Sequence, residues 1–131
     1  MTAHQKGPAT VLVVEDEALI KLSAVHAVED QGYLALSAGN ADEALLMLGA
    51  HGEIDVLFTD INMPGSMDGL ALANRTRDDY PDVEIVVASG NPKPAPGRMP
   101  LRSTFLQKPY GPDQVTDILR GLIDQTRPFV C

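Results

Sequence analysis

The chain has 131 residues, a formal net charge of −8 and one cysteine, Cys131. Its length predicts a single domain with a sizeable core, and its 44% hydrophobic and 21% charged residues are typical of a globular protein. The acidic balance argues against nucleic acid and anionic membranes as partners, because both attract basic surfaces. One cysteine excludes a disulfide framework, no apolar run reaches membrane-spanning length, and the polar start lacks the apolar segment of a signal peptide. We therefore expect a cytoplasmic protein.

Patterns of strands and helices alternate along the chain. Short runs rich in apolar and β-branched residues predict strands at residues 10–14, 33–38, 56–59, 84–88 and 104–107. Apolar residues at helical spacing predict helices at residues 18–31, 41–48, from about 70 to before 81, and from about 112 onwards. Asn40 and Glu43 form a capping-box pattern at the start of the second helix, and Gly49 and Gly52 are expected to end it.

This alternation predicts an α/β fold with one five-stranded parallel sheet and helices on both faces, a flavodoxin-like arrangement in the order 2-1-3-4-5. The domain is expected to span residues 10–127, between a flexible N-terminal segment (1–9) and a C-terminal tail (128–131). In open sheets of this kind, function gathers beyond the carboxyl ends of the strands, where the strand order reverses. Here that point lies between the first and third strands.

Polar residues stand at several of these strand ends. Glu15 and Asp16 follow the first strand, Asp60 follows the third, Ser89 the fourth and Lys108 the fifth. A lone aspartate at a strand end is usually a turn or capping residue. Because other strands end in the same way, we expect three acids, a hydroxyl and an ammonium group to meet at one edge of the sheet.

Such a set of side chains suits phosphoryl chemistry. Three clustered carboxylates repel one another unless a cation holds them. Without histidine or cysteine beside them, oxygen ligands of this number favour Mg²⁺ over a transition metal. A lysine and a hydroxyl can bind phosphoryl oxygens, and a carboxylate can act as a nucleophile that forms an acyl phosphate.

Five motifs in this order resemble the receiver domain of bacterial two-component response regulators, close in extent to the single-domain chemotaxis regulator. The resemblance covers about residues 10–126, and its motifs are residues 11–17 (VLVVEDE), 59–65 (TDINMPG), 68–70 (DGL), 88–90 (ASG) and 105–110 (FLQKPY). It implies that Asp60 accepts a phosphoryl group from the phosphohistidine of a sensor histidine kinase or histidine phosphotransferase. It also implies that Mg²⁺ is held by Glu15, Asp16, Asp60 and the backbone carbonyl of Asn62.

The resemblance assigns further roles to Lys108 and to the pair Ser89 and Phe105. Lys108 pairs with Asp60 and with the phosphoryl group, and the Lys108–Pro109 bond is expected to be cis. Ser89 and Phe105 are implied as a coupled switch pair, although the sequence pattern alone places Phe105 in the core. Tyr110 is interpreted as a residue that covers the end of the sheet.

The chain departs from the family pattern in two places. Ser66 looks like one inserted residue in the loop after Asp60. The segment 91–102, where the family has its fourth helix, contains Pro92, Pro94, Pro96 and Pro100. Proline removes a backbone donor and disfavours helix in the preceding residue, so this helix is expected to be short or missing. We then expect apolar surface on the fourth and fifth strands to be less covered, favouring a partner protein or a homodimer there.

The favoured interpretation is a stand-alone receiver that signals to a downstream protein by conformational change or acts as a phosphate sink. It would assist its own phosphorylation and dephosphorylation rather than act as an enzyme on a separate substrate. One alternative is a Mg²⁺-dependent phosphatase or phosphotransferase with an aspartate nucleophile. Such enzymes usually have a second aspartate two residues later, where this chain has Asn62. The other alternative is a binding module that needs no phosphorylation, which the complete set of acids, serine and lysine argues against.

Overall fold

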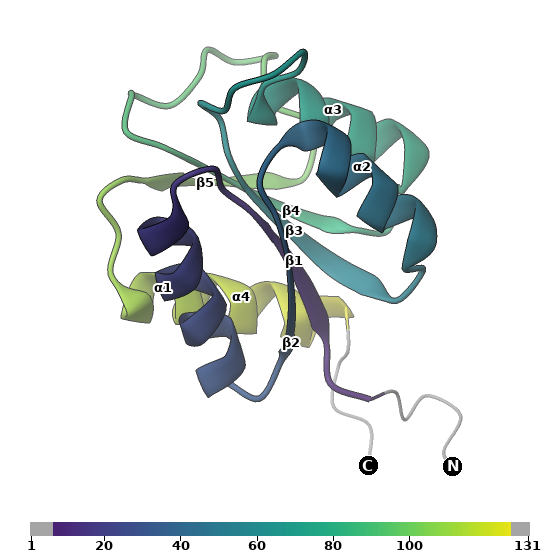
Figure 1. Cartoon of the computed structure of the whole chain (residues 1–131), viewed down its shortest axis with the longest axis vertical. Coiled ribbons are helices and arrows are strands. Elements are labelled where there is room, and N and C mark those ends of the chain that lie inside the picture. The colour runs from purple at the N-terminus through teal and green to yellow at the C-terminus, as the bar shows by residue number, and fades with distance from the viewer. Residues whose placement is uncertain (1–6, 127–131) are drawn as a thin grey trace.

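The computed structural model describes residues 7–126 (Figure 1). The predicted C-terminal tail and most of the predicted N-terminal segment lie outside these residues. Strands and helices alternate as expected until the fourth strand. The strands are β1 (Thr10–Val14), β2 (Leu34–Ala38), β3 (Ile54–Asp60), β4 (Glu84–Ser89) and β5 (Ser103–Gln107), and the helices are α1 (Ala18–Asp30), α2 (Ala41–Ala50), α3 (Gly69–Asp79) and α4 (Pro112–Thr126).

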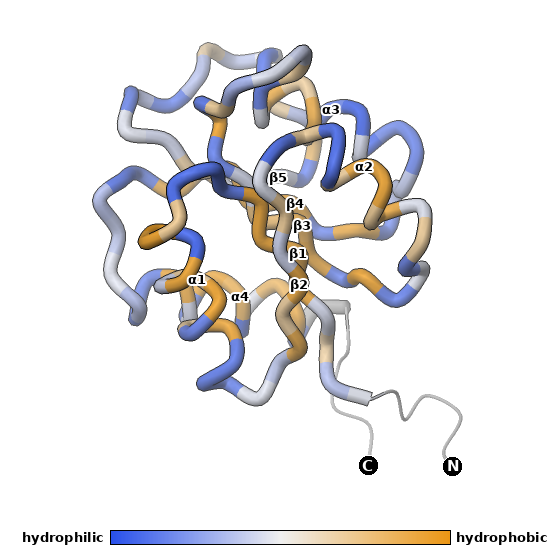
Figure 2. Tube along the Cα trace, viewed as in Figure 1, coloured by the Kyte–Doolittle hydropathy of each residue, from blue (hydrophilic) through white to orange (hydrophobic). Residues whose placement is uncertain are grey.

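The five strands form one parallel sheet in the order β2-β1-β3-β4-β5, which confirms the predicted topology. Helices α1 and α4 cover one face, and α2 and α3 cover the other (Figure 1). Figure 2 shows why the sheet is central: the strands are largely hydrophobic, whereas the hydrophilic residues lie mostly on the outer sides of the helices and in the loops. Within the described residues, no helix is both long and apolar enough to cross a bilayer.

The core has two layers because successive strand residues point to opposite faces of the sheet. In β1, Val11 and Val13 belong to the cluster under α1 and α4, whereas Leu12 and Val14 belong to the cluster under α2 and α3. All five residues of β1 are buried. This central strand therefore fixes the position of the residue that follows it, Glu15.

A side-chain cap positions the start of α2. Asn40 accepts a hydrogen bond from the Glu43 N–H (2.8 Å), and the Glu43 carboxylate accepts one from the Gly39 N–H (2.7 Å), so the predicted capping pattern is confirmed. The prediction that Gly49 ends α2 is wrong, because the helix continues to Ala50. A glycine costs a helix only about 1 kcal/mol, and the burial of Ala44 and Leu48 on the same helix outweighs that cost.

Between β4 and β5, the described chain contains no helix, in agreement with the prediction for the proline-rich segment. One turn forms, in which the Arg98 N–H donates to the Ala95 carbonyl (3.1 Å). Side chains of α3 hold the rest of the segment. The Asn74 amide donates to the Arg98 carbonyl (3.0 Å), and the Arg77 guanidinium donates to the carbonyls of Leu101 (3.0 Å) and Arg102 (3.2 Å). We call residues 91–102 the β4–β5 loop.

Candidate functional site

The predicted site residues lie together at the carboxyl edge of the sheet. Parallel strands in register bring their ends to one edge: Asp60 in β3 is paired with Ala88 in β4, and Ser89 is paired with Gln107 in β5. Lys108 follows β5 directly, as Glu15 follows β1. Residues separated by 93 positions in the sequence are therefore in contact.

Lys108 is the link between the two buried acids. Its Nζ lies 3.0 Å from Oε1 of Glu15 and 3.2 Å from Oδ2 of Asp60. The side chains of Glu15 and Asp60 are only 4% and 6% exposed, so solvent screens these ion pairs weakly. Asp16 is exposed, yet its carboxylate belongs to the same cluster: one oxygen from each of Glu15, Asp16 and Asp60 lies within 4.8 Å of the others.

Burial and charge act in opposite directions in this cluster. Burial raises the pKa of Glu15 above its ordinary value, and the hydrogen bond from Lys108 only partly offsets it. Burial alone would lower the pKa of Lys108, but the hydrogen bonds and negative charges of Glu15 and Asp60 outweigh it and raise that pKa overall. Lys108 is therefore a cation at neutral pH and a ready partner for a further anionic oxygen.

The donor set fits a hard divalent cation. Three carboxylates face one ammonium group, which leaves two negative charges when all are ionised. The clustered ligands are all oxygen atoms, the type that Mg²⁺ prefers. Asn62 lies in the loop beyond Asp60, and its N–H points to Oδ1 of Asp60 at 3.4 Å. The ligand role of the Asn62 carbonyl stays a prediction.

The backbone around Asp60 is held by contacts that the sequence patterns did not reveal. The Thr59 hydroxyl donates to the Asp60 carbonyl (3.0 Å). The Gly69 N–H donates to the Ile61 carbonyl (2.8 Å), and α3 starts so close to the strand end that a β-carbon on Gly69 would overlap the Asp60 carbonyl oxygen. Gly69 belongs to the family motif at residues 68–70, but the motif alone does not indicate this contact.

Ser89 and Phe105 differ in their surroundings. Ser89 is buried, and its hydroxyl oxygen accepts a hydrogen bond from the Asn91 N–H (3.0 Å). Its carbonyl accepts hydrogen bonds from the Lys108 N–H (2.8 Å) and from the Gln107 side-chain amide (3.2 Å). Phe105 is half-buried rather than part of the fully buried core. The geometry connects Ser89 to the root of the β4–β5 loop, and the switch role of the pair stays a prediction.

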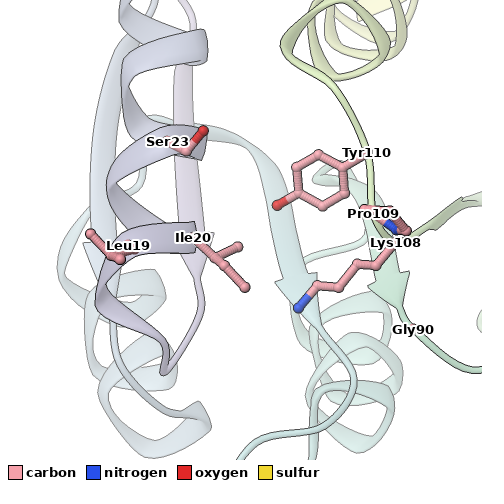
Figure 3. A pocket seen from close by; sticks show the side chains of 7 residues that line it. All are labelled: Leu19, Ile20, Ser23, Gly90, Lys108, Pro109 and Tyr110. Atoms are coloured by element: carbon pink, nitrogen blue, oxygen red, sulfur yellow. The ribbon is translucent and has the colours of Figure 1, made fainter.

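A pocket of about 580 Å³ opens beside Lys108, between the start of α1 and the segment after β5 (Figure 3). The Lys108–Pro109 bond in this segment is cis, as expected. The Tyr110 ring packs on Phe58, with ring centroids 5.7 Å apart, so it covers the sheet end as interpreted from the sequence. Tyr110 also lines the pocket, which the sequence did not indicate.

Comparison with known proteins identifies the family of this site. The family model for the response regulator receiver domain matches residues 11–120. The chain belongs to this family. Receiver domains accept a phosphoryl group on an aspartate, and the geometry around Asp60 fits that role.

The chain matches segments of two longer relatives. The sensor kinase CckA of Brucella abortus is 33% identical over 123 residues, which are 91% of this chain and 13% of the relative. The nitrogen assimilation regulatory protein NtrX of Azorhizobium caulinodans is 30% identical over 121 residues, 89% of this chain and 26% of the relative. The chain thus spans a small part of these relatives.

Solved receiver structures superpose closely on this chain. The chemotaxis response regulator CheY4 of Vibrio cholerae has a TM-score of 0.79 at 26% identity, covering 88% of this chain and 98% of that one. The receiver domain of the hybrid histidine kinase CckA has a TM-score of 0.76 at 28% identity, covering 88% and 99%.

Proposed function

We propose that Asp60 accepts a phosphoryl group from the phosphohistidine of a sensor histidine kinase or histidine phosphotransferase. The observation that supports this assignment most strongly is the buried ion-pair system in which Lys108 contacts both Asp60 (3.2 Å) and Glu15 (3.0 Å). An aspartate this buried, at the end of a central strand and next to a cation, is placed to act as a nucleophile. We assign the receiver domain to residues 10–127.

The transfer needs little beyond positioning and charge neutralisation. An oxygen of Asp60 forms a bond to phosphorus while the phosphorus–nitrogen bond of the donor breaks, and the electron pair of that bond stays on the imidazole nitrogen. The Lys108 ammonium group donates a hydrogen bond to a phosphoryl oxygen as well as to the carboxylates, and so neutralises part of the phosphoryl charge. The Ser89 hydroxyl donates to a second phosphoryl oxygen while it continues to accept from the Asn91 N–H.

Glu15, Asp16, Asp60 and the Asn62 carbonyl would hold Mg²⁺. When bound, Mg²⁺ neutralises charge on the carboxylates and on the incoming phosphoryl oxygens. Because Glu15 also contacts Lys108, its carboxylate would bind the lysine and the metal ion at the same time. Both positive charges would then stay near Asp60.

The output side of the site is the β4–β5 loop. Its root is fixed by Ser89 and Gln107, and Leu101 near its end is 82% exposed. Contact of this loop with a downstream protein or with a second copy of the chain is part of the proposal. The expectation that β4 would be less covered is wrong, because its residues from Ile85 to Ser89 are all buried by the packing on both faces of the sheet. The enzyme alternative is less favoured, because the position two residues after Asp60 carries an amide, Asn62, and not a second acid.

Mass spectrometry of the intact protein tests the acceptor assignment. With Mg²⁺ and acetyl phosphate, the wild type should gain one phosphoryl group, and Asp60→Asn should gain none. Asp42→Asn, which changes an exposed acid in the first turn of α2, should label like the wild type. Labelling of Asp60→Asn at the wild-type level would show that another residue is the acceptor.

A further inference from the structure

Tyr110 occupies a defined position beside the acidic site. It lies two residues after Lys108, and its ring packs against the buried Phe58 at an interplanar angle of 48°. The ring is also partly buried against the core cluster under α1 and α4. Burial raises the pKa of Tyr110 above its ordinary value, so the hydroxyl is protonated and uncharged at neutral pH.

The Tyr110 hydroxyl points into the pocket. Figure 3 shows it directed into the gap between α1 and the segment after β5, the same gap into which Lys108 extends its ammonium group. Across residues 7–126, no protein group forms a hydrogen bond with this hydroxyl. A half-buried hydroxyl that stays unpaired while facing a pocket is available to a group that enters from outside.

The pocket leads to the phosphoacceptor. Its walls are mostly apolar, with Leu19, Ile20 and Pro109 around the polar groups of Ser23, Tyr110 and Lys108. Lys108 Nζ is 3.2 Å from the Asp60 carboxylate, so an atom that reaches the lysine from this pocket is next to the acceptor. A flat ring with apolar faces and a polar edge matches walls of this composition.

We propose that Tyr110 is a specificity-determining residue that recognises the imidazole ring of the phosphodonor, its hydroxyl oxygen accepting a hydrogen bond from the ring N–H remote from phosphorus. This inference rests on the proposed function of Asp60. During transfer, the Asp60 oxygen–phosphorus bond forms and the phosphorus–nitrogen bond breaks, leaving its electron pair on the ring. The other ring nitrogen keeps its proton, so the ring leaves as neutral imidazole. The hydrogen bond to Tyr110 stabilises the phosphorylated ring in the form that carries a proton on this remote nitrogen. That form is the better donor, because its leaving group is neutral imidazole and not the imidazolate anion.

Two small phosphodonors separate ring recognition from bond cleavage. Phosphoimidazole and phosphoramidate both transfer phosphorus from nitrogen, but only phosphoimidazole has a ring N–H that can reach Tyr110. In Tyr110→Phe the ring and its packing on Phe58 remain, and only the hydroxyl is lost. We expect the ratio of the second-order rate constants, phosphoimidazole over phosphoramidate, to fall about tenfold, which corresponds to about 1.4 kcal/mol, the size of one hydrogen bond.

Tyr33→Phe is the matched control. Tyr33 is also half-buried with a raised pKa caused by burial, but it precedes β2 at the opposite end of the sheet. Its loss of a hydroxyl should leave the ratio at the wild-type value. A wild-type ratio in Tyr110→Phe would overturn the proposal. This includes the case in which both rate constants fall by the same factor, because the ratio is then unchanged. Failure of acetyl phosphate to label wild-type Asp60 would instead refute the proposed function, so the two failures are distinguishable.

Discussion

The tight contact between Gly69 and the end of β3 makes a strong prediction about Gly69→Ala. A β-carbon at this position would overlap the Asp60 carbonyl oxygen and lie 2.7 Å from the Asp60 carbonyl carbon and 2.9 Å from the Ile61 Cα. Non-bonded carbon atoms rest at about 3.5–4.0 Å, so the chain must separate by roughly 1 Å. All three obstructing atoms belong to the backbone and cannot move aside as a flexible side chain would.

The expected cost of Gly69→Ala combines three contributions. Overpacking of this kind costs about 1–3 kcal/mol, and loss of the 2.8 Å hydrogen bond from the Gly69 N–H to the Ile61 carbonyl adds about 1 kcal/mol. Lower entropy of the unfolded chain returns about 0.4–1 kcal/mol. We expect the free energy of unfolding to fall by about 2–3 kcal/mol and Tm by roughly 10 °C.

Equilibrium unfolding in urea measures this cost, with Gly121→Ala as the matched control. Gly121 lies on an exposed part of α4, and nothing lies within 4 Å of a β-carbon there. Its replacement should stabilise the protein by up to about 1 kcal/mol through helix propensity. The reasoning fails if Gly69→Ala is as stable as the wild type. Because two of the displaced atoms belong to Asp60 and the third to the next residue, Ile61, labelling by acetyl phosphate should also be slower in Gly69→Ala.

Two further predictions concern charge and the β4–β5 loop. Asp16→Ala should raise stability in the absence of Mg²⁺ by relieving repulsion among the clustered carboxylates, and it should abolish the rise in Tm that Mg²⁺ causes. The control, Glu17→Ala, should keep that rise. An unchanged rise in Asp16→Ala would remove Asp16 from the ligand set. Arg77→Ala should lower the free energy of unfolding by about 2 kcal/mol, because it leaves the carbonyls of Val83, Leu101 and Arg102 without their charged donor. The Pro81 carbonyl loses one of its two charged donors and keeps Arg102. Arg75→Ala, which removes only an exposed ion pair with Asp79, should leave stability unchanged. Equal effects of the two substitutions would contradict the role of Arg77 in holding the β4–β5 loop.

Strand ends could be predicted from the sequence because each depends on a local pattern. An apolar run that stops at Glu15, Asp60 or Lys108 marks both the strand and its polar end. Once the strands are parallel, their carboxyl ends meet at one edge of the sheet, so the polar ends of four strands together imply one site. The prediction that Gly49 ends α2 was wrong for the opposite reason. Whether a glycine ends a helix depends on the packing of its neighbours, which no local pattern contains.

The contacts missed by the sequence analysis depend on distances across the fold. Gly69 reads as an ordinary helix start, and its need to lack a side chain arises only when α3 meets the end of β3. The side chains of Asn74 and Arg77 read as a solvated helix surface, yet they bond to carbonyls 24 or 25 residues away in the sequence. Tyr110 was correctly interpreted as a cover for the sheet end, but the direction of its hydroxyl depends on the packing of its ring on Phe58.

These contacts also connect the proposed phosphoacceptor to the β4–β5 loop. Two contact chains lead from Asp60 to the β4–β5 loop. One runs through Lys108 to Ser89, whose hydroxyl and carbonyl hold the loop root. The other runs through the close contact of Gly69 with Asp60 and along α3, whose Arg77 side chain holds the loop end. A helix in this position satisfies its own backbone groups, whereas this loop takes several of its hydrogen bonds from elements that touch the phosphoacceptor. We predict that a phosphoryl mimic at Asp60 changes hydrogen exchange in the loop together with α3 and β5, and a change confined to the loop would contradict this coupling.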